Sequence, residues 1–446
     1  MSVSAFASVT KANTDENLKL SEMYRSDHNL RKLCLFSNIP HDEYNRIYIF
    51  PAIERCMKIA IEYNTYRISV DSGGIEEYCQ LACAFVLGNN SNAIIQNRCF
   101  GVQTISSTGA LRLGAQFLRE KLAYTTFCTI HPDCRGIYNS VFIAAGFEQG
   151  FTLRVPEIEN TTFKYFLLDL ERVPERSVLV IGICGITSTG LEPTMFEWNK
   201  IAYIVARKNL FVFFDATFQG LISGDPDTDA YHVRYFEQKG FEFFIAQDFS
   251  FNMGLVSERP GNLCVVQKSA STCRNTKAIL SEYMRVSCFT PPVLGAHIVS
   301  KILSDIYLRE EYQENLKAIV LKYEILRNSF ICNLKRFCKK YDCEKYENQK
   351  GLYVNIDLTL PQIELLQNEH IYVPNGGWFC IAGLNNVNMD FFCKKIIETV
   401  SCANTENSSS AIPINKERID AANSRSKKTS KAKKVNVNKR IMLSEK

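Results

Sequence analysis

SVLVIGICG, residues 177–185, is a short apolar run without polar alternation, and similar runs follow at 210–216 (LFVFFDA) and 241–248 (FEFFIAQD). The segments between them, 196–207 and 228–238, have helical periodicity. Apolar strands separated by helices are typical of a parallel sheet that is covered on both faces. We therefore predict an α/β fold with a mostly parallel central sheet and helices on both faces.

The same runs, together with a short run at 262–267, locate the ligand-binding edge of this sheet. In open α/β sheets, ligands bind beyond the carboxyl ends of the strands. Asp215 and Asp248 stand near the ends of two runs, and Phe251 follows three residues after Asp248. We expect these three residues to lie close to any ligand site.

The remainder of the chain differs in character from this region. Residues 308–340 have a helical pattern, and the short strands and helices after them indicate a separate, smaller α+β layer. From residue 403 the chain has no aromatic residue and is rich in Asn, Ser, Lys and Arg, which is typical of disorder. We predict an N-terminal arm at 1–32, a small domain at 33–47 plus 317–402, a large domain at 48–316 and a disordered basic tail at 403–446.

Composition excludes several classes of protein. The 446 residues are 46% hydrophobic and 22% charged, as in ordinary globular proteins. No apolar run approaches the roughly 20 residues of a membrane span, and residues 1–20 lack the apolar segment of a secretory signal. The 17 cysteines include no Cys-x-x-Cys pair, and no His-Glu-x-x-His motif occurs. We expect reduced thiols, no metal site and a cytoplasmic location.

The net charge of +5 is concentrated in the basic tail. Residues 403–446 contain eleven basic and four acidic residues, which leaves a net charge of −2 for the rest. The segment RSKKTSKAKKVNVNKR, 425–440, is typical of a nuclear-import signal or a polyanion-binding tail, with a solvated tail that has no partner as the alternative. Because it lacks aromatic side chains for stacking, we expect no sequence-specific contact with nucleic acid.

FGVQTISSTGALRLGAQFL, residues 100–118, is the segment with the most chemical content. A short strand pattern leads into Ser106, Ser107, Thr108 and Gly109, where helical periodicity begins. Hydroxyl groups and free N–H groups at a helix N-terminus form an anion-binding site. An ordinary Ser/Thr helix cap is the alternative.

Residues 103–118 resemble the cofactor-phosphate loop of the aspartate aminotransferases, which are fold type I pyridoxal-phosphate enzymes. Further motifs of that family are matched, in order, by LFVFFDATFQG (210–220), AQDFSFNMGLVSERPG (246–261), RVSCFTPPVLGA (285–296) and IYVPNGGWFCIAG (371–383). The resemblance implies a large domain around the sheet, a smaller domain from both chain ends, and a role in amino-acid metabolism. It also implies a homodimer with its sites at the interface.

Several residues match cofactor or substrate contacts of this family. The resemblance places Asp215 against the pyridine nitrogen of pyridoxal 5'-phosphate, which a carboxylate keeps protonated. It places Arg285 where the family binds the distal carboxylate of the substrate in the neighbouring subunit. The phosphate contacts fall on residues that we call the phosphate cup: Ser106, Ser107, Thr108, Asp248 and Arg259.

The position of the family's Schiff-base lysine is occupied by Phe251. That lysine holds the cofactor covalently and later moves the α-proton of the substrate. Phenylalanine has neither a nitrogen nor a titratable group, and no lysine lies between Lys239 and Lys268. No catalytic residue is therefore predicted at this position.

Further departures surround the same site. Trp378 stands where the family has the arginine that binds the substrate's α-carboxylate, so five donors are replaced by one N–H. Phe218 replaces a tyrosine and Thr187 an asparagine, both of which contact the cofactor's phenolic oxygen in the family. Arg135 replaces the tryptophan that stacks on the pyridine ring. Asn38 lies in a bulkier version of the family's substrate loop.

Asp248 falls on a serine that contacts the phosphate in the family. A carboxylate at this position repels a phosphate dianion. We predict an Arg259–Asp248 ion pair that closes the phosphate cup. We therefore expect an aspartate aminotransferase-like dimer that binds a partner or ligand but does not catalyse transamination.

Two other functions remain open from the sequence. In the first, the chain holds pyridoxal phosphate non-covalently and catalyses aspartate/2-oxoglutarate transamination or an altered, lysine-independent reaction. In the second, the pocket is a non-covalent sensor of dicarboxylates that uses Arg285 and Arg135.

Overall fold

The structure, a computed structural model, describes residues 4, 6–7, 16–42, 46–131, 136–154, 163–184, 190 and 192–409. The chain divides into two compact units, Met1–Thr399 and Val400–Lys446. In the second unit, the described residues 400–409 are helical. The first unit contains the sheets and the candidate site. The disordered tail was predicted from residue 403; residues 403–409 are helical, and the rest of that tail lies outside the described residues.

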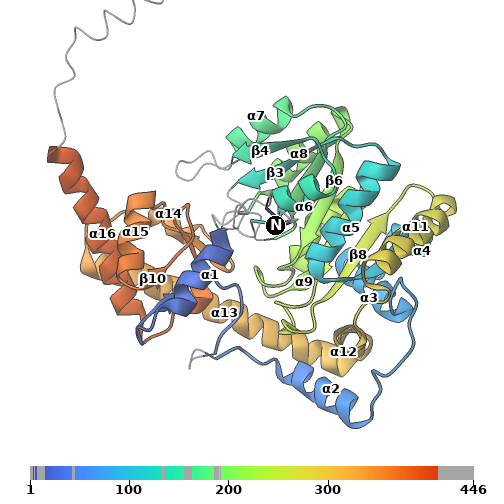
Figure 1. Cartoon of the computed structure of the whole chain (residues 1–446), viewed down its shortest axis with the longest axis horizontal. Helices are drawn as coiled ribbons and strands as arrows, with labels where there is room; N and C mark the ends of the chain where they lie inside the picture. Colours follow the sequence, from blue (N-terminus) through green and yellow to red (C-terminus); the bar gives the residue numbers. More distant parts are fainter. Residues whose placement is uncertain are drawn as a thin grey trace, which may run out of the picture. The chain divides into compact units, whose positions relative to one another are not determined.

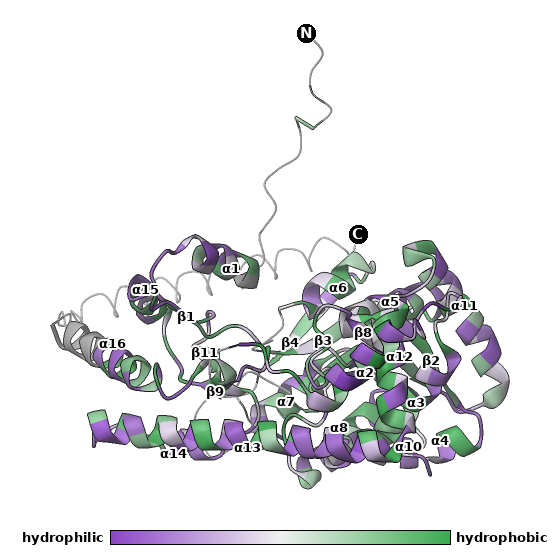
Figure 2. Ribbon diagram, turned by 90° about the horizontal axis from the view of Figure 1, so that it is seen from below, coloured by the Kyte–Doolittle hydropathy of each residue, from purple (hydrophilic) through white to green (hydrophobic). Residues whose placement is uncertain are grey.

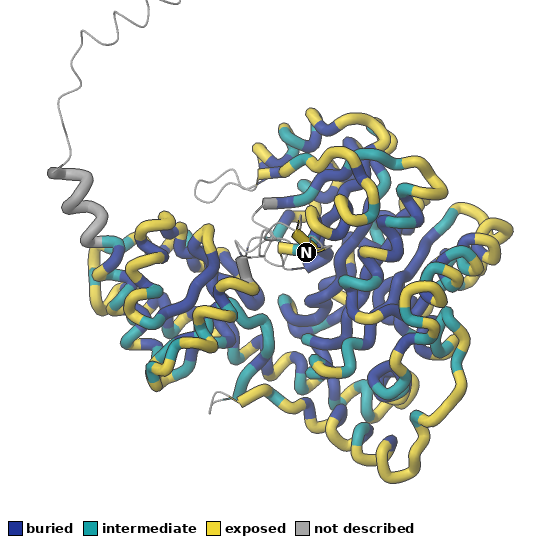
Figure 3. The backbone as a smooth tube through the Cα atoms, viewed as in Figure 1, coloured by how far each residue is buried: buried dark blue, intermediate teal, exposed yellow. Residues whose placement is uncertain are grey.

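A seven-stranded sheet forms the centre of the first unit, and most of its strands are buried (Figure 3). Its strand order is β2-β8-β7-β6-β5-β3-β4. Neighbouring strands from β7 to β4 run parallel, whereas β8 runs antiparallel to both β2 and β7. The strands are β2 (Cys99–Ile105), β3 (Thr126–His131), β4 (Gln149–Arg154), β5 (Val178–Gly182), β6 (Phe211–Ala216), β7 (Phe243–Asp248) and β8 (Pro260–Val266). The predicted mostly parallel sheet is confirmed.

The apolar runs form adjacent strands in the middle of this sheet. β5, β6 and β7 arise from the runs at 177–185, 210–216 and 241–248, and every residue of β5 and β7 is buried. Because helices cover both faces of these strands, their sequences need no polar alternation. The run at 262–267 forms most of β8, which is the one antiparallel strand among them.

Helices cover the sheet (Figure 1). α5 packs against β7 and β8, α3 against β2 and β8, and α11 against β2. Close packing requires Gly114 on α5, because an added Cβ would lie 2.5 Å from the ring of Phe213. The helices of this region are α2 (Pro51–Glu62), α3 (Glu76–Leu87), α4 (Asn92–Ile95), α5 (Ser106–Lys121), α6 (Tyr138–Ala144), α7 (Lys164–Arg172), α8 (Met195–Arg207), α9 (Pro226–Asp229), α10 (Tyr231–Gln238), α11 (Ala270–Cys288) and α12 (Val293–Ser304).

The helix predicted at 228–238 is interrupted at Ala230, between α9 and α10. Asp229, at the end of α9, is buried, and its carboxylate accepts backbone N–H groups of the preceding loop, including that of Gly220 at 2.7 Å. These bonds hold the end of α9 against that loop. The sequence pattern contained no sign of this tertiary contact.

The long helix α13 (Ile306–Phe337) begins the C-terminal part of the first unit and alternates apolar and polar residues along its length (Figure 2). β1 pairs in parallel with β10, so residues 33–34 lie beside 371–372. β9 pairs with β11 in antiparallel register. The remaining elements are α1 (Glu16–Ser26), β1 (Leu33–Cys34), α14 (Glu344–Glu347), β9 (Tyr353–Asn355), α15 (Leu360–Asn368), β10 (Ile371–Tyr372), β11 (Trp378–Cys380), η1 (Ile381–Gly383) and α16 (Met389–Ser409).

The pairing of β1 with β10 brings segments from both chain ends together, while the predicted domain boundaries stay predictions. Among the described residues, no helix is long and apolar enough to cross a membrane.

A buried histidine joins α10 to α8. His232 stacks on Trp198 with ring centroids 4.2 Å apart, and its Nε2 makes a hydrogen bond with the carbonyl oxygen of Ile183. Burial lowers the pKa of His232 from 6.5 to about 4. The folded state therefore keeps this imidazole neutral at pH values where the unfolded chain protonates it.

We predict that this histidine makes the fold less stable in mild acid. Because the unfolded imidazole binds a proton below about pH 6.5 and the folded one below about pH 4, stability falls across that interval, by about 3 kcal/mol in full. Urea unfolding between about pH 4.5 and 7 measures this loss. His232→Gln should flatten the profile, and His28→Gln, at an exposed histidine, should leave it unchanged. An equally steep profile in His232→Gln would assign the loss to other groups.

Candidate functional site

Strand register brings the phosphate cup together. β8 lies between β2 and β7, with Pro260 opposite Ile105 and Gly261 opposite Asp248. The start of α5, the end of β7 and the residue before β8 therefore meet at one edge of the sheet. An added Cβ on Gly261 would lie 2.4 Å from the backbone of Ser106, so these segments are in close contact.

The carboxylate of Asp248 accepts hydrogen bonds from the serines of the cup. Its Oδ2 accepts hydrogen bonds from Ser106 Oγ at 2.5 Å and from the Ser107 backbone N and Oγ, each at 3.2 Å. Its Oδ1 accepts from the Ser250 backbone N at 2.8 Å. Asp248 is only 1% exposed. A buried carboxylate needs donors of this kind, and here the residues that match phosphate contacts supply them.

The predicted Arg259–Asp248 ion pair was wrong. Arg259 Nη2 instead donates to Ser106 Oγ at 3.0 Å, and the same hydroxyl donates to Asp248. The physical reason is that Ser106 stands between the two charged groups and bridges them. The cup is thus closed by a hydroxyl relay, and the guanidinium lies 6.0 Å from the ring centroid of Phe251.

Two residues of the cup have unusual backbone conformations. Ser106 has φ 63° and Arg259 has φ 53°, in the left-handed region that non-glycine residues rarely adopt. The Ser106 backbone N donates to the Arg259 carbonyl at 2.7 Å, which holds the two residues together. Such conformations cost about 1–3 kcal/mol each and cluster at functional sites. Contacts with the surrounding chain therefore hold Ser106 and Arg259 in these costly conformations.

Asp215 also accepts hydrogen bonds from other residues of the chain. It is 3% exposed at the end of β6, where Tyr138 Oη donates to its Oδ2 at 2.8 Å and the Thr217 backbone N donates to its Oδ1 at 3.0 Å. Thr217 Oγ1 lies 2.5 Å from this Oδ1 and 2.7 Å from Ser107 Oγ. A hydrogen-bond network therefore connects Asp215 to the cup and to Asp248.

Tyr138 and Thr217 are site residues that the sequence interpretation missed. Thr217 stands two residues after Asp215, and an aspartate side chain in a turn often accepts a hydrogen bond from the backbone two residues later. This spacing could have pointed to Thr217. Tyr138 reaches Asp215 from a different part of the chain, so no local pattern pointed to it.

A continuous set of aromatic contacts leads away from Phe251. The ring centroids of Phe251 and Phe218 are 5.5 Å apart, those of Phe218 and Tyr353 are 5.8 Å apart, and those of Tyr353 and Trp378 are 5.2 Å apart. We call these four residues the aromatic chain. Three of its members, Phe218, Tyr353 and Trp378, are buried. Three positions identified as departures from the family are thus joined, through Tyr353, into one packed structure.

The other predicted site residues are distributed differently. Arg285 is on α11, half-exposed, and forms a two-pronged pair with Glu282 at 2.7 and 2.6 Å. The described part of this single chain does not bring its guanidinium to the cup. Asn38 is half-buried, and its Oδ1 has no hydrogen-bond partner among the described residues. Arg135 and Thr187 lie outside the described residues.

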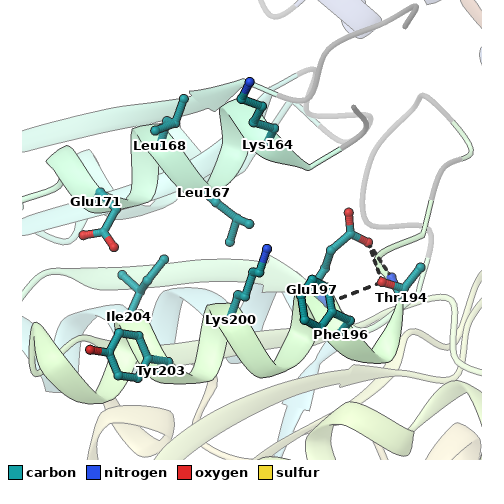
Figure 4. Close-up of a pocket in the computed structure, with 10 residues that line it drawn as sticks. All are labelled: Lys164, Leu167, Leu168, Glu171, Thr194, Phe196, Glu197, Lys200, Tyr203 and Ile204. Atoms are coloured by element: carbon teal, nitrogen blue, oxygen red, sulfur yellow. Dashed lines mark hydrogen bonds between the residues drawn. The ribbon is translucent and has the colours of Figure 1, made fainter. Parts of the chain in front are cut away.

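A separate groove of about 520 Å³ lies between α7 and α8. It is lined by apolar side chains such as Leu167 and Phe196, with Lys164 and Lys200 at its margins (Figure 4). Glu197 at its end belongs to the helix cap of α8, where its carboxylate accepts the backbone N–H of Thr194 at 2.8 Å. The lining contains none of the cup residues. No group of three or more metal-binding side chains occurs in the part of the chain that the structure describes.

Comparison with known proteins gives a consistent result. The sequence model of the aminotransferase class I and II family matches residues 32–404. The chain is 35% identical to the cytoplasmic aspartate aminotransferase of Caenorhabditis elegans over 330 residues, which cover 73% of this chain and 81% of that protein.

Solved structures agree with this match. Aspartate aminotransferase from Saccharomyces cerevisiae cytoplasm has a TM-score of 0.84 and 25% identity, covering 89% of this chain and 98% of that one. An aromatic-amino-acid aminotransferase from Burkholderia pseudomallei, covalently bound to pyridoxal phosphate, has a TM-score of 0.83 and 25% identity, covering 89% and 100%. The broad specificity aminotransferase from Leishmania mexicana has a TM-score of 0.82 and 28% identity, covering 88% and 97%.

We predict that the Asp248 carboxylate stabilises the fold. Asp248→Ala removes a buried acceptor of four hydrogen bonds and leaves Ser106 and Ser107 without it, so the free energy of unfolding should fall by about 2–4 kcal/mol. Urea unfolding at neutral pH measures the change. Asp390→Ala, which removes an exposed partner of Arg336, is the matched control and should cost less than about 1 kcal/mol. Equal, small losses in both variants would contradict this role for Asp248.

Proposed function

The chain belongs to the class I and II aminotransferase family, and within that family we propose that it is an aspartate aminotransferase-like protein that does not catalyse transamination. The observation that carries the proposal is the buried Asp248 carboxylate, which takes the hydrogen bonds of Ser106 and Ser107. These are the groups that match phosphate contacts of the family. The cup therefore does not fit the phosphate of pyridoxal phosphate while Asp248 remains in it.

Electrostatics supports this proposal. Two unit negative charges about 4 Å apart repel by about 4 kcal/mol at an effective dielectric constant of about 20, and a phosphate dianion carries more than one charge. Arg259 is the cation of the cup, and it already donates to Ser106. A phosphate would have to displace a carboxylate that the protein binds with its own donors.

The position of the family's lysine supports the same proposal. Phe251 has no nitrogen for a covalent link and no group that could move a proton. The centroid of its ring instead lies 5.5 Å from that of Phe218, and the guanidinium of Arg259 lies over the ring. Trp378 is buried against Tyr353, so it offers packing where the family binds the α-carboxylate of its substrate.

The second candidate function is a lysine-independent reaction with non-covalent pyridoxal phosphate. The residues that favour it are Asp215, Ser106, Thr108 and Arg259, which match the family's cofactor contacts. The aminotransferase from Burkholderia pseudomallei, which has this fold, is covalently bound to that cofactor. This function requires Asp248 to leave the cup. A dicarboxylate sensor built on Arg285 has less support, because Glu282 already binds that arginine in the single chain.

For partners and location, we propose a homodimer in the cytoplasm, as the family and the cytoplasmic C. elegans relative suggest. The basic tail supplies a route to the nucleus or to polyanions. A mixed dimer with an active relative is the alternative arrangement. Deletion of residues 425–446 followed by localisation would separate import from an inert tail.

We predict that the purified chain neither binds pyridoxal phosphate tightly nor transaminates aspartate with 2-oxoglutarate. Calorimetric titration, cofactor absorbance and a coupled assay measure this, with the C. elegans cytoplasmic aspartate aminotransferase as the positive control. Phe251→Lys alone should gain little, because the carboxylate remains in the cup. Asp248→Ser should improve affinity at least about tenfold through loss of the charge repulsion, and the double variant should add the absorbance of a lysine-bound cofactor.

Detectable transamination by the wild-type chain would overturn the proposal. Tight cofactor binding by wild type without lysine-type absorbance would favour the second candidate function instead.

A further inference from the structure

The outer face of α8 carries two large aromatic side chains that the fold leaves exposed. Phe196 and Tyr203 are each 66% exposed. They lie two turns apart on one side of the helix, whereas Trp198 and Ile201 are buried on the other side. The outer face of a surface helix is ordinarily polar. Aromatic residues that share such a face indicate a contact surface.

α7 supplies the other wall of the groove next to this face. Leu168 on α7 is 44% exposed, and Leu167 and Ile204 lie deeper, where the two helices face each other (Figure 4). All ten lining residues belong to α7, to α8 or to Thr194, which caps α8. The lining therefore includes no strand edge with which an extended peptide could pair. Two helix walls and an apolar floor instead suit the side of a third helix.

The carboxylates of the groove already have partners within the chain. Glu171 forms an ion pair with Arg207. Glu197 accepts hydrogen bonds from the backbone N and the Oγ1 of Thr194, each at 2.8 Å. Neither carboxylate is therefore free to receive a cation from a partner without losing a contact of the folded chain.

The lysines of the groove lack such partners. Lys164 and Lys200 are exposed, and neither forms an ion pair or a hydrogen bond with the described residues. The Nζ of Lys200 lies 4.2 Å from the centroid of the Phe196 ring, so the charge stands beside the aromatic face. With Arg207 counted, three cations stand against two carboxylates at the groove. This balance favours an acidic partner over a basic one.

We propose that the groove between α7 and α8 binds an acidic amphipathic helix of a partner protein. The apolar side chains of that helix pack on Leu167, Phe196 and Tyr203, and carboxylates on its flank pair with Lys164 and Lys200. Phe196 and Tyr203 are about 10 Å apart along α8, so a partner helix of about three turns covers both. The groove shares no residue with the phosphate cup, so this proposal does not depend on the loss of transamination.

The test is fluorescence anisotropy with the full-length chain and labelled peptides. The probe is a synthetic amphipathic helix with leucines on one face and glutamates on its flanks. A second peptide has lysines in place of the glutamates, and a third spreads the leucines of the first around the helix. Wild type should bind the first peptide saturably, and at least about tenfold more tightly than the other two.

Variants of the groove assign the binding to it. Phe196→Ala and Tyr203→Ala should each weaken binding of the acidic peptide at least about tenfold, because they remove exposed aromatic contacts. Both should keep the wild-type melting temperature, since neither side chain is buried. Lys200→Glu should weaken binding of the acidic peptide and strengthen binding of the basic one. The matched control is Tyr307→Ala, which removes a tyrosine that is 79% exposed on α13 and should bind as wild type does.

The proposal is overturned if wild type does not bind the acidic peptide saturably. It is also overturned if the groove variants bind like wild type, which would assign the binding to another site such as the basic tail. Sedimentation velocity separates a partner from a second copy of the chain. Tyr203→Glu should keep the mass of wild type, and a lower mass would show that a second copy covers this face instead.

Discussion

The charge of Asp248 imposes the main constraint on the candidate site, because a carboxylate that is 1% exposed must have its oxygens met by donors. The chain provides them from the start of α5 and from the turn after β7, and Arg259 approaches through Ser106. Both Ser106 and Arg259 hold left-handed backbone conformations in this arrangement. The residues that would bind a phosphate are thus the residues that stabilise a buried charge of the protein itself.

The strand order of the sheet brings the residues of the cup together. Ser106 and Asp248 are distant in sequence, and they meet because β8 inserts in antiparallel register between β2 and β7. The close approach of Gly261 to the Ser106 backbone leaves no room for a side chain there. The family framework therefore places the cup residues, while the identity of the side chain at position 248 decides what the cup contains.

Periodicity and motif order predicted the central strands and the cup because these features are local. β5, β6 and β7 follow from apolar runs, and the helix that begins at Ser106 follows from its hydroxyl-rich start. Contacts between distant segments were not predictable in the same way. The direct Arg259–Asp248 pair was wrong because a sequence gives charges and order but not that a hydroxyl lies between them. Tyr138 and Tyr353 join the site from other elements, and no spacing reveals such partners.

Asp248 in the cup and Arg327 beside β9 are two buried charged groups that the protein stabilises in different ways. Asp248 has donors on both carboxylate oxygens, whereas the guanidinium of Arg327 donates to backbone carbonyl oxygens and interacts electrostatically with Glu324 on the same helix. The two are linked through Tyr353, whose carbonyl oxygen accepts from Arg327 and whose ring begins the path to Phe218 and Phe251. Contacts of this kind transmit a change only if one member has two arrangements. The bond from Arg327 to the Tyr353 carbonyl, at 3.4 Å, is the polar contact of that path, and the rest of the path consists of ring contacts.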